Sequence, residues 1–216
     1  MVFTKPARPG EVKTRLIGEL SAEQTAALHQ AFLDDLVVRL KTGRHAVWLA
    51  WALDAEEDLP ASSVPGVRQS GEDLGARLQR ALGTAALRYP LVAAVGSDHP
   101  EMPLERVEEA FERLASGGAD VVIGPADDGG YYLIAARPDS LHPAIFEGIE
   151  WSTREVLGQT LERCARLGLE VHQLAVGHDV DTPRDLPRLA SFLSRNPEAC
   201  PRTRELFLRW GLVTAA

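Results

Sequence analysis

The 216-residue sequence contains only two cysteines, Cys164 and Cys200, and their separation fits neither a metal-binding motif nor a disulfide framework. No apolar run comes near the roughly 18 residues that a membrane-spanning helix needs. The first residues after Met1 lack the apolar core of a signal peptide. Together these absences predict a cytoplasmic protein with reduced thiols and no membrane partner.

Basic residues are also in short supply, since 23 Lys and Arg stand against 31 Asp and Glu and give a net charge of −8. This balance argues against nucleic acid as a partner, because a nucleic-acid surface needs a basic patch. The first fifteen residues differ, with four basic side chains and one acid, Glu11. A basic loop in an acidic protein favours a small anionic ligand such as phosphate, and a solvated charged loop is the alternative interpretation.

The length suits one α/β domain, which we expect to span residues 1–216, and a hydrophobic content of 45% is sufficient for a packed core. Apolar runs of strand length alternate with segments of helical periodicity, which predicts a mostly parallel sheet with helices on both faces. We expect strands at residues 1–3, 46–52, 91–95, 119–123, 131–136 and 169–176. We expect helices at residues 21–42, 73–88, 103–116, 152–167, 182–195 and 202–210, and a surface loop at residues 54–65. Ser21 and Gln24 fit a capping box at the start of the first helix.

The basic loop is not one of the familiar phosphate-binding loops. A Walker A loop needs glycine directly before its Lys-Thr pair, whereas Gly10 lies three residues before Lys13, and a dinucleotide motif needs three glycines. Lys13 and Arg15 are nevertheless suited to neutralise a diphosphate, and the guanidinium of Arg15 offers a bidentate contact.

Acidic residues follow two other expected strands, at the sheet edge where α/β proteins bind ligands. Asp98 comes just after the strand at 91–95, where a carboxylate can hold Mg²⁺ or can simply anchor the next turn. Asp179 and Asp181 precede the helix at 182–195. A helix cap would account for Thr182, Pro183 and Asp185, whereas a second metal carboxylate is the functional interpretation of the Asp179–Asp181 pair.

The segment Asp127-Asp128-Gly129-Gly130 permits two interpretations. Asp-Gly-Gly is typical of a hairpin turn. Alternatively, the glycines let a substrate lie against the backbone while one aspartate acts as a general base or a substrate ligand.

Taken in order, these segments resemble the bacterial GT-A-fold transferases described as glycosyltransferases, some of them linked to arsenosugar biosynthesis or to radical-SAM genes. The resemblance covers nearly the whole chain. The matching motifs are Phe3-Thr4-Lys5-Pro6 with Pro9-Gly10 and Val12-Lys13-Thr14-Arg15-Leu16, Gly96-Ser97-Asp98 with Pro100, Gly124-Pro125 with Asp128-Gly129-Gly130-Tyr131, and Asp179-Val180-Asp181-Thr182-Pro183 with Asp185-Leu186. The chain is more distantly similar to phospholactate guanylyltransferases and molybdenum-cofactor nucleotidyltransferases, in which a basic first loop holds phosphates and an aspartate like Asp98 holds Mg²⁺.

The resemblance implies a single-domain, Rossmann-like GT-A fold of the nucleotide-diphospho-sugar transferase type, a three-layer sandwich. It favours a metal-dependent transferase that uses a nucleotide-activated donor, in the first place an NDP-sugar, with a small-molecule acceptor. A nucleotidyltransferase that acts on a nucleoside triphosphate is the second interpretation, and a non-catalytic nucleotide-binding protein is the third.

The expected roles follow from this interpretation. Asp98 and Asp181 would hold Mg²⁺ or Mn²⁺ against the diphosphate. Lys13 and Arg15 would stabilise the developing charge. Asp128 or Asp127 would be the base for the acceptor hydroxyl. The donor-binding set is Lys5, Gly10, Lys13, Arg15, Gly129 and Gly130. An apolar stretch at residues 206–213, expected to be exposed, suggests a homodimer interface.

Overall fold

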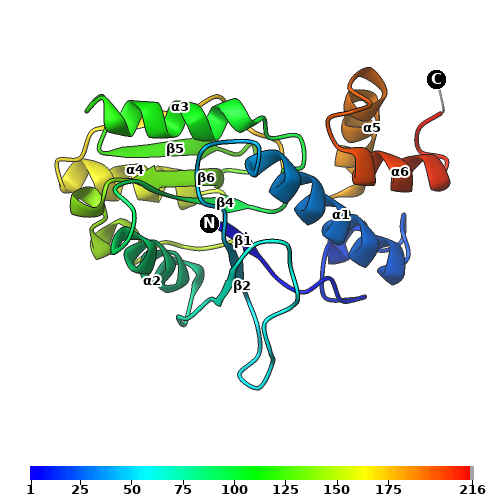
Figure 1. The fold of residues 1–216 in the computed structure, drawn as a ribbon, viewed down its shortest axis with the longest axis horizontal. Coiled ribbons are helices and arrows are strands. Elements are labelled where there is room, and N and C mark those ends of the chain that lie inside the picture. The colour runs from blue at the N-terminus through cyan, green and yellow to red at the C-terminus, as the bar shows by residue number, and fades with distance from the viewer. Residues whose placement is uncertain (215–216) are drawn as a thin grey trace.

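A computed structural model describes residues 1–214 and contains one seven-stranded sheet with helices packed on both of its faces (Figure 1). The strand order across the sheet is β3-β2-β1-β4-β6-β5-β7. The strands are β1 (Val2–Thr4), β2 (Leu49–Trp51), β3 (Gly66–Arg68), β4 (Val92–Gly96), β5 (Val121–Pro125), β6 (Tyr131–Ala136) and β7 (Val171–Gln173). The helices are α1 (Ala22–Leu40), α2 (Leu74–Ala86), α3 (Leu104–Ala115), α4 (Val156–Arg166), α5 (Leu186–Arg195) and α6 (Pro201–Arg209).

The central strands are apolar throughout because helices cover both of their faces, as the continuous apolar runs predicted. In β4, Ala93 and Val95 pack with α1 and α3, whereas Val92 and Ala94 pack with α2 and α4. This alternation follows from the two-residue period of a strand. It confirms the predicted three-layer α/β sandwich.

The sheet is mostly parallel, and β6 is the strand that departs from this pattern. It pairs in antiparallel fashion with both β4 and β5. Only five residues, 126–130, connect β5 to β6, and a parallel pairing would need a much longer crossover. The Asp127–Gly130 segment is therefore a hairpin turn, closed by a hydrogen bond from the Ala126 amide to the Gly130 carbonyl oxygen (3.0 Å).

Most predicted elements are present, with shorter strands than expected. The N-terminus of α1 has the predicted capping box, since the Gln24 amide donates to the Ser21 hydroxyl and the Ser21 amide donates to the Gln24 side chain. The strand β3 was missed. It is a three-residue edge strand with no fully buried side chain, so the sequence there contains no apolar run.

The C-terminal helices α5 and α6 lie beside α1 at one end of the molecule (Figure 1). The buried carboxylate of Asp35 on α1 accepts hydrogen bonds from the backbone of Arg202 and from the amide and hydroxyl of Thr203, at 2.7–3.1 Å. Around this contact, a separate hydrophobic cluster joins α1 and α5 to Leu16 and Phe207. The first loop of the chain is thus held in place by the C-terminal helices.

The expectation of an exposed apolar stretch at residues 206–213 is wrong. Phe207 and Val213 are buried in that cluster, and Leu206, Leu208 and Leu212 pack against it. The homodimer therefore remains a prediction, and the C-terminal stretch does not supply an exposed apolar interface for it. Within residues 1–214, none of the helices combines the length and the apolar character required to cross a membrane.

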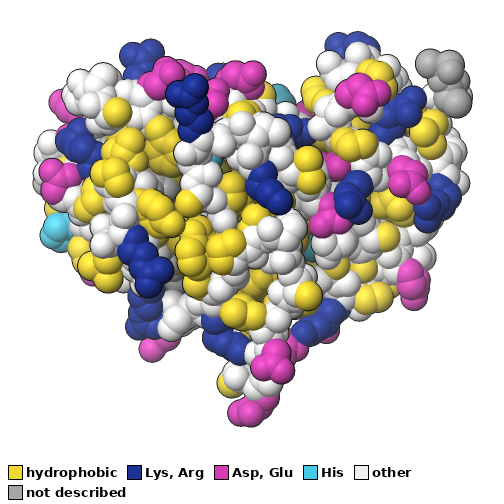
Figure 2. All heavy atoms as spheres, viewed as in Figure 1, with side chains coloured by type: hydrophobic (Ala, Val, Ile, Leu, Met, Phe, Trp, Pro, Cys, Tyr) yellow, Lys and Arg dark blue, Asp and Glu magenta, His cyan; other side chains and the backbone are white. Residues whose placement is uncertain are grey.

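Charged side chains of both signs are interspersed on the face shown in Figure 2, with no single-sign patch on that face.

Candidate active site

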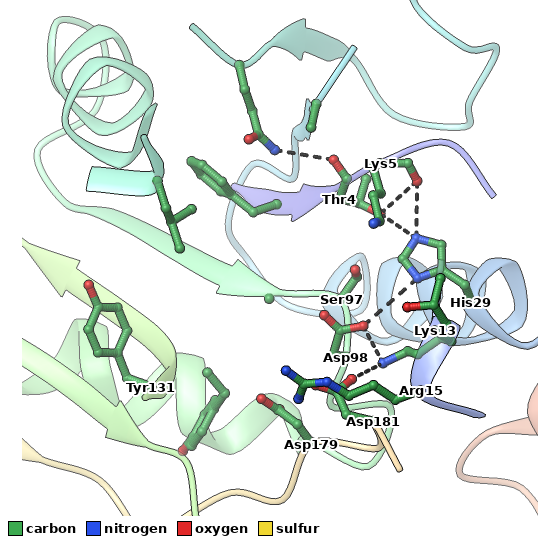
Figure 3. A pocket seen from close by; sticks show the side chains of 17 residues that line it. Thr4, Lys5, Lys13, Arg15, His29, Ser97, Asp98, Tyr131, Asp179 and Asp181 are labelled. Carbon is green, nitrogen blue, oxygen red and sulfur yellow. Dashed lines mark hydrogen bonds and ion pairs between the residues drawn. The ribbon is translucent and has the colours of Figure 1, made fainter. Parts of the chain in front are cut away.

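A cavity of about 440 Å³ opens at the carboxyl ends of β1, β2 and β4. The parallel strands of an α/β sheet end at one edge, where crossing loops leave room for a ligand. The cavity collects residues from the first loop, from the segment after β4, from the loop before α5, and the two tyrosines that begin β6. Its charged or polar lining includes Thr4, Lys5, Lys13, Arg15, His29, Ser97, Asp98, Tyr131, Asp179 and Asp181 (Figure 3).

Lys13 lies at the centre of the charged wall. Its ammonium group forms ion pairs with the Oδ1 atoms of Asp98 and Asp181, the second at 2.8 Å (Figure 3). The side chain of Lys13 is only 2% exposed, whereas those of Asp98 and Asp181 are 42% and 40% exposed. Burial disfavours the charged amine, but the two carboxylates outweigh burial and raise the pKa of Lys13. The lysine therefore stays protonated.

The backbone of Lys13 adopts the left-handed conformation, with φ of 48°. A residue with a side chain adopts this conformation at a cost of about 1–2 kcal/mol. The left-handed residue begins the 3₁₀ turn Thr14–Leu16, whose Leu16 is fully buried among α1 and the C-terminal helices. The strained backbone at Lys13 thus directs the lysine side chain inward and places Leu16 in the core.

Asp98 follows β4 directly, as the sequence predicted. Its carbonyl oxygen accepts a hydrogen bond from the Val180 amide (3.0 Å), which ties it to the segment that carries Asp179 and Asp181. Desolvation by the surrounding protein opposes ionisation of Asp98, but the ammonium group of Lys13 more than compensates and lowers the pKa of its carboxyl. Asp98 is therefore a carboxylate at neutral pH.

His29 is a site residue that the sequence interpretation missed. Its ring is buried, its Nε2 lies 3.1 Å from the Lys5 carbonyl oxygen and 3.2 Å from the Thr4 hydroxyl, and its Nδ1 lies 3.9 Å from Asp98. Burial lowers the pKa of His29, so the ring is neutral, and the carbonyl partner requires that Nε2 carry the proton. A histidine four residues before Leu33, on the apolar stripe of α1, was the available signal.

Asp181 and Asp179 lie on the loop before α5. Asp185 reaches back to accept hydrogen bonds from the Asp181 and Thr182 amides, at 3.0 and 2.7 Å, so the structural role expected for Asp185 is present. Asp179 also lines the cavity, although the sequence had favoured Asp181 of this pair. Burial, followed by the charges of Asp98 and Asp181, raises the pKa of Asp179 to about 7.

Asp127 and Asp128 do not line the cavity. Asp127 is 2.6 Å from Nδ1 of His178, and both side chains are about half exposed. Asp128 accepts a hydrogen bond from the Gly130 amide (2.8 Å) within the hairpin turn. The two acids are thus engaged in contacts of the turn and of the loop beside it.

The two glycines of this turn have a structural explanation. Gly129 has φ of +94°, and a Cβ there would overlap the backbone of Arg154. A Cβ on Gly130 would lie 3.2 Å from the Asp128 carboxylate. Close packing of the protein's own atoms accounts for Gly129 without any ligand.

The remaining residues of the first loop divide between the cavity and its rim. Arg15 lines the cavity, and its contacts with the rest of residues 1–214 include no ion pair. Lys5 also lines it, although its ammonium group donates to the Glu11 carbonyl oxygen. Gly10 lies outside the lining and is exposed, with φ of +81° in the turn that precedes Lys13.

The described residues form no cluster of three or more His, Cys, Asp or Glu side chains placed to hold a metal ion. A pair of carboxylates suits Mg²⁺ or Mn²⁺ all the same, because Mg²⁺ is commonly held by one or two carboxylates together with substrate phosphates and water. That Asp98 and Asp181 already share one cation, the Lys13 ammonium group, shows that the pair accommodates a positive charge between its oxygens. The donor set therefore fits a divalent ion that arrives with phosphate oxygens.

The sheet order and the cavity define a chain with the fold of the nucleotide-diphospho-sugar transferases. A protein of Desulfovibrio desulfuricans G20, provisionally designated a nucleotide-diphospho-sugar transferase, is 34% identical to this chain, with a TM-score of 0.90 over 98% of this chain and 94% of that one. The chain belongs to the family described as uncharacterised proteins conserved in bacteria (DUF2064), whose model matches residues 26–153.

More distant structures share the fold alone. A cytidylyltransferase of Leptospira borgpetersenii is 13% identical, with a TM-score of 0.59 over 100% of this chain and 95% of that one. Rv0371c of Mycobacterium tuberculosis H37Rv, solved in complex with manganese, is 16% identical, with a TM-score of 0.50 over 87% of this chain and 95% of that one. No curated protein sequence matches this chain.

Proposed function

We propose that this protein is a metal-dependent transferase that acts on a nucleotide-activated donor, in the first place a nucleotide-diphospho-sugar. The observation that carries the proposal is the juxtaposition of Lys13, Asp98 and Asp181 on one wall of a cavity at the carboxyl edge of the sheet. A relative that is 34% identical over nearly its whole length carries a provisional designation for the same chemistry. The cavity is large enough for a nucleotide, since ligand pockets of about 300–1,000 Å³ are typical.

The proposal gives the residues of the cavity the following roles. Asp98 and Asp181 would bind Mg²⁺ or Mn²⁺, which supplies Lewis-acid stabilisation of the diphosphate leaving group when bound. Arg15 lines the same cavity and would contact the phosphates in a bidentate fashion, with Lys13 adding positive charge behind the carboxylates. Lys5 lines the same cavity and would add positive charge on the donor side, whereas Gly10 would contribute only through the turn that precedes Lys13.

The residue that would activate the acceptor is harder to assign than the residues that would bind the donor. Asp127 and Asp128 were the bases expected from the sequence, but Asp179 is the acidic residue that adds a further carboxylate to the lining. We infer from this position that Asp179 faces the acceptor or the metal. Asp127, Asp128, Gly129 and Gly130 lie in the hairpin turn, outside the cavity lining. They would contact an acceptor only if it extended beyond the cavity to this turn.

Nucleotidyl transfer is the second candidate, and a specific observation favours it. The cavity lining lacks the two acids of the hairpin turn, and attack by a phosphorylated acceptor needs no such base. The similarity of the fold to that of a cytidylyltransferase is consistent with this candidate. In that case the donor is a nucleoside triphosphate and the leaving group is pyrophosphate.

The two candidates release different products, so one experiment separates them. The purified protein is screened by thermal shift against nucleotide-sugars and nucleoside triphosphates, each with and without Mn²⁺, because a ligand that binds only the native state raises the melting temperature. Turnover in the presence of candidate hydroxyl-bearing and phosphorylated acceptors is then followed as release of nucleoside diphosphate or of pyrophosphate, with EDTA as the control. We expect nucleoside diphosphate release that EDTA abolishes.

Pyrophosphate release would replace the first candidate with the second. A metal-independent shift without turnover would indicate a nucleotide-binding protein and would contradict both. The homodimer and the cytoplasmic location stay predictions from the sequence.

A further inference from the structure

The two carboxylates expected to bind the metal already share a cation. The ammonium group of Lys13 contacts Oδ1 of both Asp98 and Asp181. A divalent ion would be held by the carboxylates of the same two residues. The ammonium group and a metal ion would therefore compete for the same two carboxylates.

The position of the lysine is fixed by its surroundings. Its side chain is almost completely buried, its ammonium group lies 5.4 Å from the centroid of the Phe32 ring, and its left-handed backbone is held by the 3₁₀ turn that follows. The two carboxylates, by contrast, are each about 40% exposed toward the cavity. The protein thus neutralises part of the charge of Asp98 and Asp181 from the buried side and leaves their exposed side open.

This arrangement weakens the attraction of the site for a free divalent ion, because two like charges a few ångströms apart repel. A diphosphate changes the balance, since its oxygens contribute new negative charge to both the metal and the lysine. By thermodynamic linkage, a phosphate ligand that raises the affinity for the metal has its own affinity raised by the metal by the same factor.

We propose that Lys13 is a resident counter-ion that competes with the divalent cation for Asp98 and Asp181, so that the metal binds tightly only together with the phosphates of the donor. The inference rests on the proposed metal site of the transferase. It adds that binding of metal and of donor is coupled through one buried lysine. Loading of the site with metal alone is disfavoured.

The test is Mn²⁺ binding in the absence of nucleotide, measured from the electron paramagnetic resonance signal of free Mn²⁺. The variant Lys13→Met keeps an unbranched side chain, one atom shorter, and removes its charge. The variant Lys13→Arg keeps the charge. Arg15→Met is the matched control. It removes a cation that lines the same cavity but forms no ion pair with Asp98 or Asp181.

We expect Lys13→Met to bind Mn²⁺ at least about tenfold more tightly than the wild type, because the competing charge is gone. Lys13→Arg and Arg15→Met should stay within about threefold of the wild type. Asp98→Asn should abolish the binding in every background. We expect Lys13→Met to fold, because water can hydrate the exposed carboxylates of Asp98 and Asp181 once the lysine is gone. The melting temperature of this variant in EDTA checks its folding.

A second measurement follows the coupling directly. Melting temperatures are recorded with Mn²⁺, with inorganic pyrophosphate, and with both. In the wild type the joint shift should exceed the sum of the two single shifts, and this excess should be smaller in Lys13→Met, where only the direct contact between metal and phosphate couples the two ligands.

Equal or weaker Mn²⁺ binding by Lys13→Met, with binding still lost in Asp98→Asn, would overturn the role of Lys13 and leave the metal site in place. Mn²⁺ binding that persists in Asp98→Asn, or is absent from every variant even with pyrophosphate, would remove the metal site of the proposed function and the inference with it.

Discussion

Residues 5–15 and residues 126–130 follow strands that end at the same edge of the sheet, yet they place their charges differently. The first loop turns Lys13 inward until its side chain is 2% exposed between two carboxylates. The second leaves the side chain of Asp127 53% exposed, next to a half-exposed histidine. Membership of one sheet edge is therefore insufficient to make a residue part of the cavity. The decisive factor is whether neighbouring elements cover the side chain and direct it inward.

Loss of the central carboxylate should have the largest effect on activity. We expect Asp98→Asn to lower metal-dependent turnover by at least about a hundredfold, because the variant weakens the contact with the metal and with Lys13 that stabilises charge in the transition state. The rate is measured as release of nucleoside diphosphate or pyrophosphate at saturating donor. Retention of full metal-dependent turnover would exclude Asp98 as a metal ligand.

The glycines of the two regions offer a comparison in stability. Gly129→Ala should lower the free energy of unfolding by about 2–4 kcal/mol, because the new methyl group combines a left-handed φ with an overlap against the Arg154 backbone. Gly10→Ala should cost only about 1 kcal/mol, since its φ of +81° is unfavourable but its Cβ would meet no atom within 4 Å. Urea unfolding measures both. Equal losses at the two positions would contradict the packing explanation for Gly129.

A smaller effect should follow from removal of the side chain that holds the Asp181 loop. Asp185→Ala deletes the acceptor for the Asp181 and Thr182 amides and should cost about 1 kcal/mol of stability, as loss of a helix cap does. Because Asp181 then moves more freely beside Lys13, Mn²⁺ affinity should also fall a few-fold. Asp185→Asn keeps an acceptor oxygen and should retain most of both. A stability loss without any change in Mn²⁺ affinity would show that the cap does not position Asp181.

The smallest effect is expected at the hairpin turn. Asp127→Asn should change turnover by less than about twofold, since an exposed ion pair such as Asp127 with His178 contributes little. The same substitution at Asp179, inside the cavity, should reduce turnover by at least about tenfold. A large loss in Asp127→Asn combined with a small one in Asp179→Asn would return the acceptor site to the turn, as the sequence had suggested.

Much of the architecture was predictable because the chain repeats a simple physical pattern. Continuous apolar runs such as 91–95 predicted strands with helices on both faces, and Ser21 with Gln24 predicted the start of α1. The edge strand β3 could not be predicted in this way, because three partly exposed residues leave no periodic signal. The antiparallel direction of β6 follows from its short connection to β5, which an alternation of elements does not reveal.

The candidate site shows the same division. By itself the sequence determined that a basic loop and strand-end aspartates reach one edge of an α/β sheet, because apolar patterning fixes the strands and chain direction fixes their carboxyl ends. Only the tertiary structure decided which charges meet. It paired Lys13 with Asp98 and Asp181, brought His29 and Asp179 into the cavity, and left Asp127 and Asp128 outside it. These outcomes depend on burial and side-chain direction, which arise from packing between segments up to 168 residues apart, a separation over which local sequence patterns carry no information.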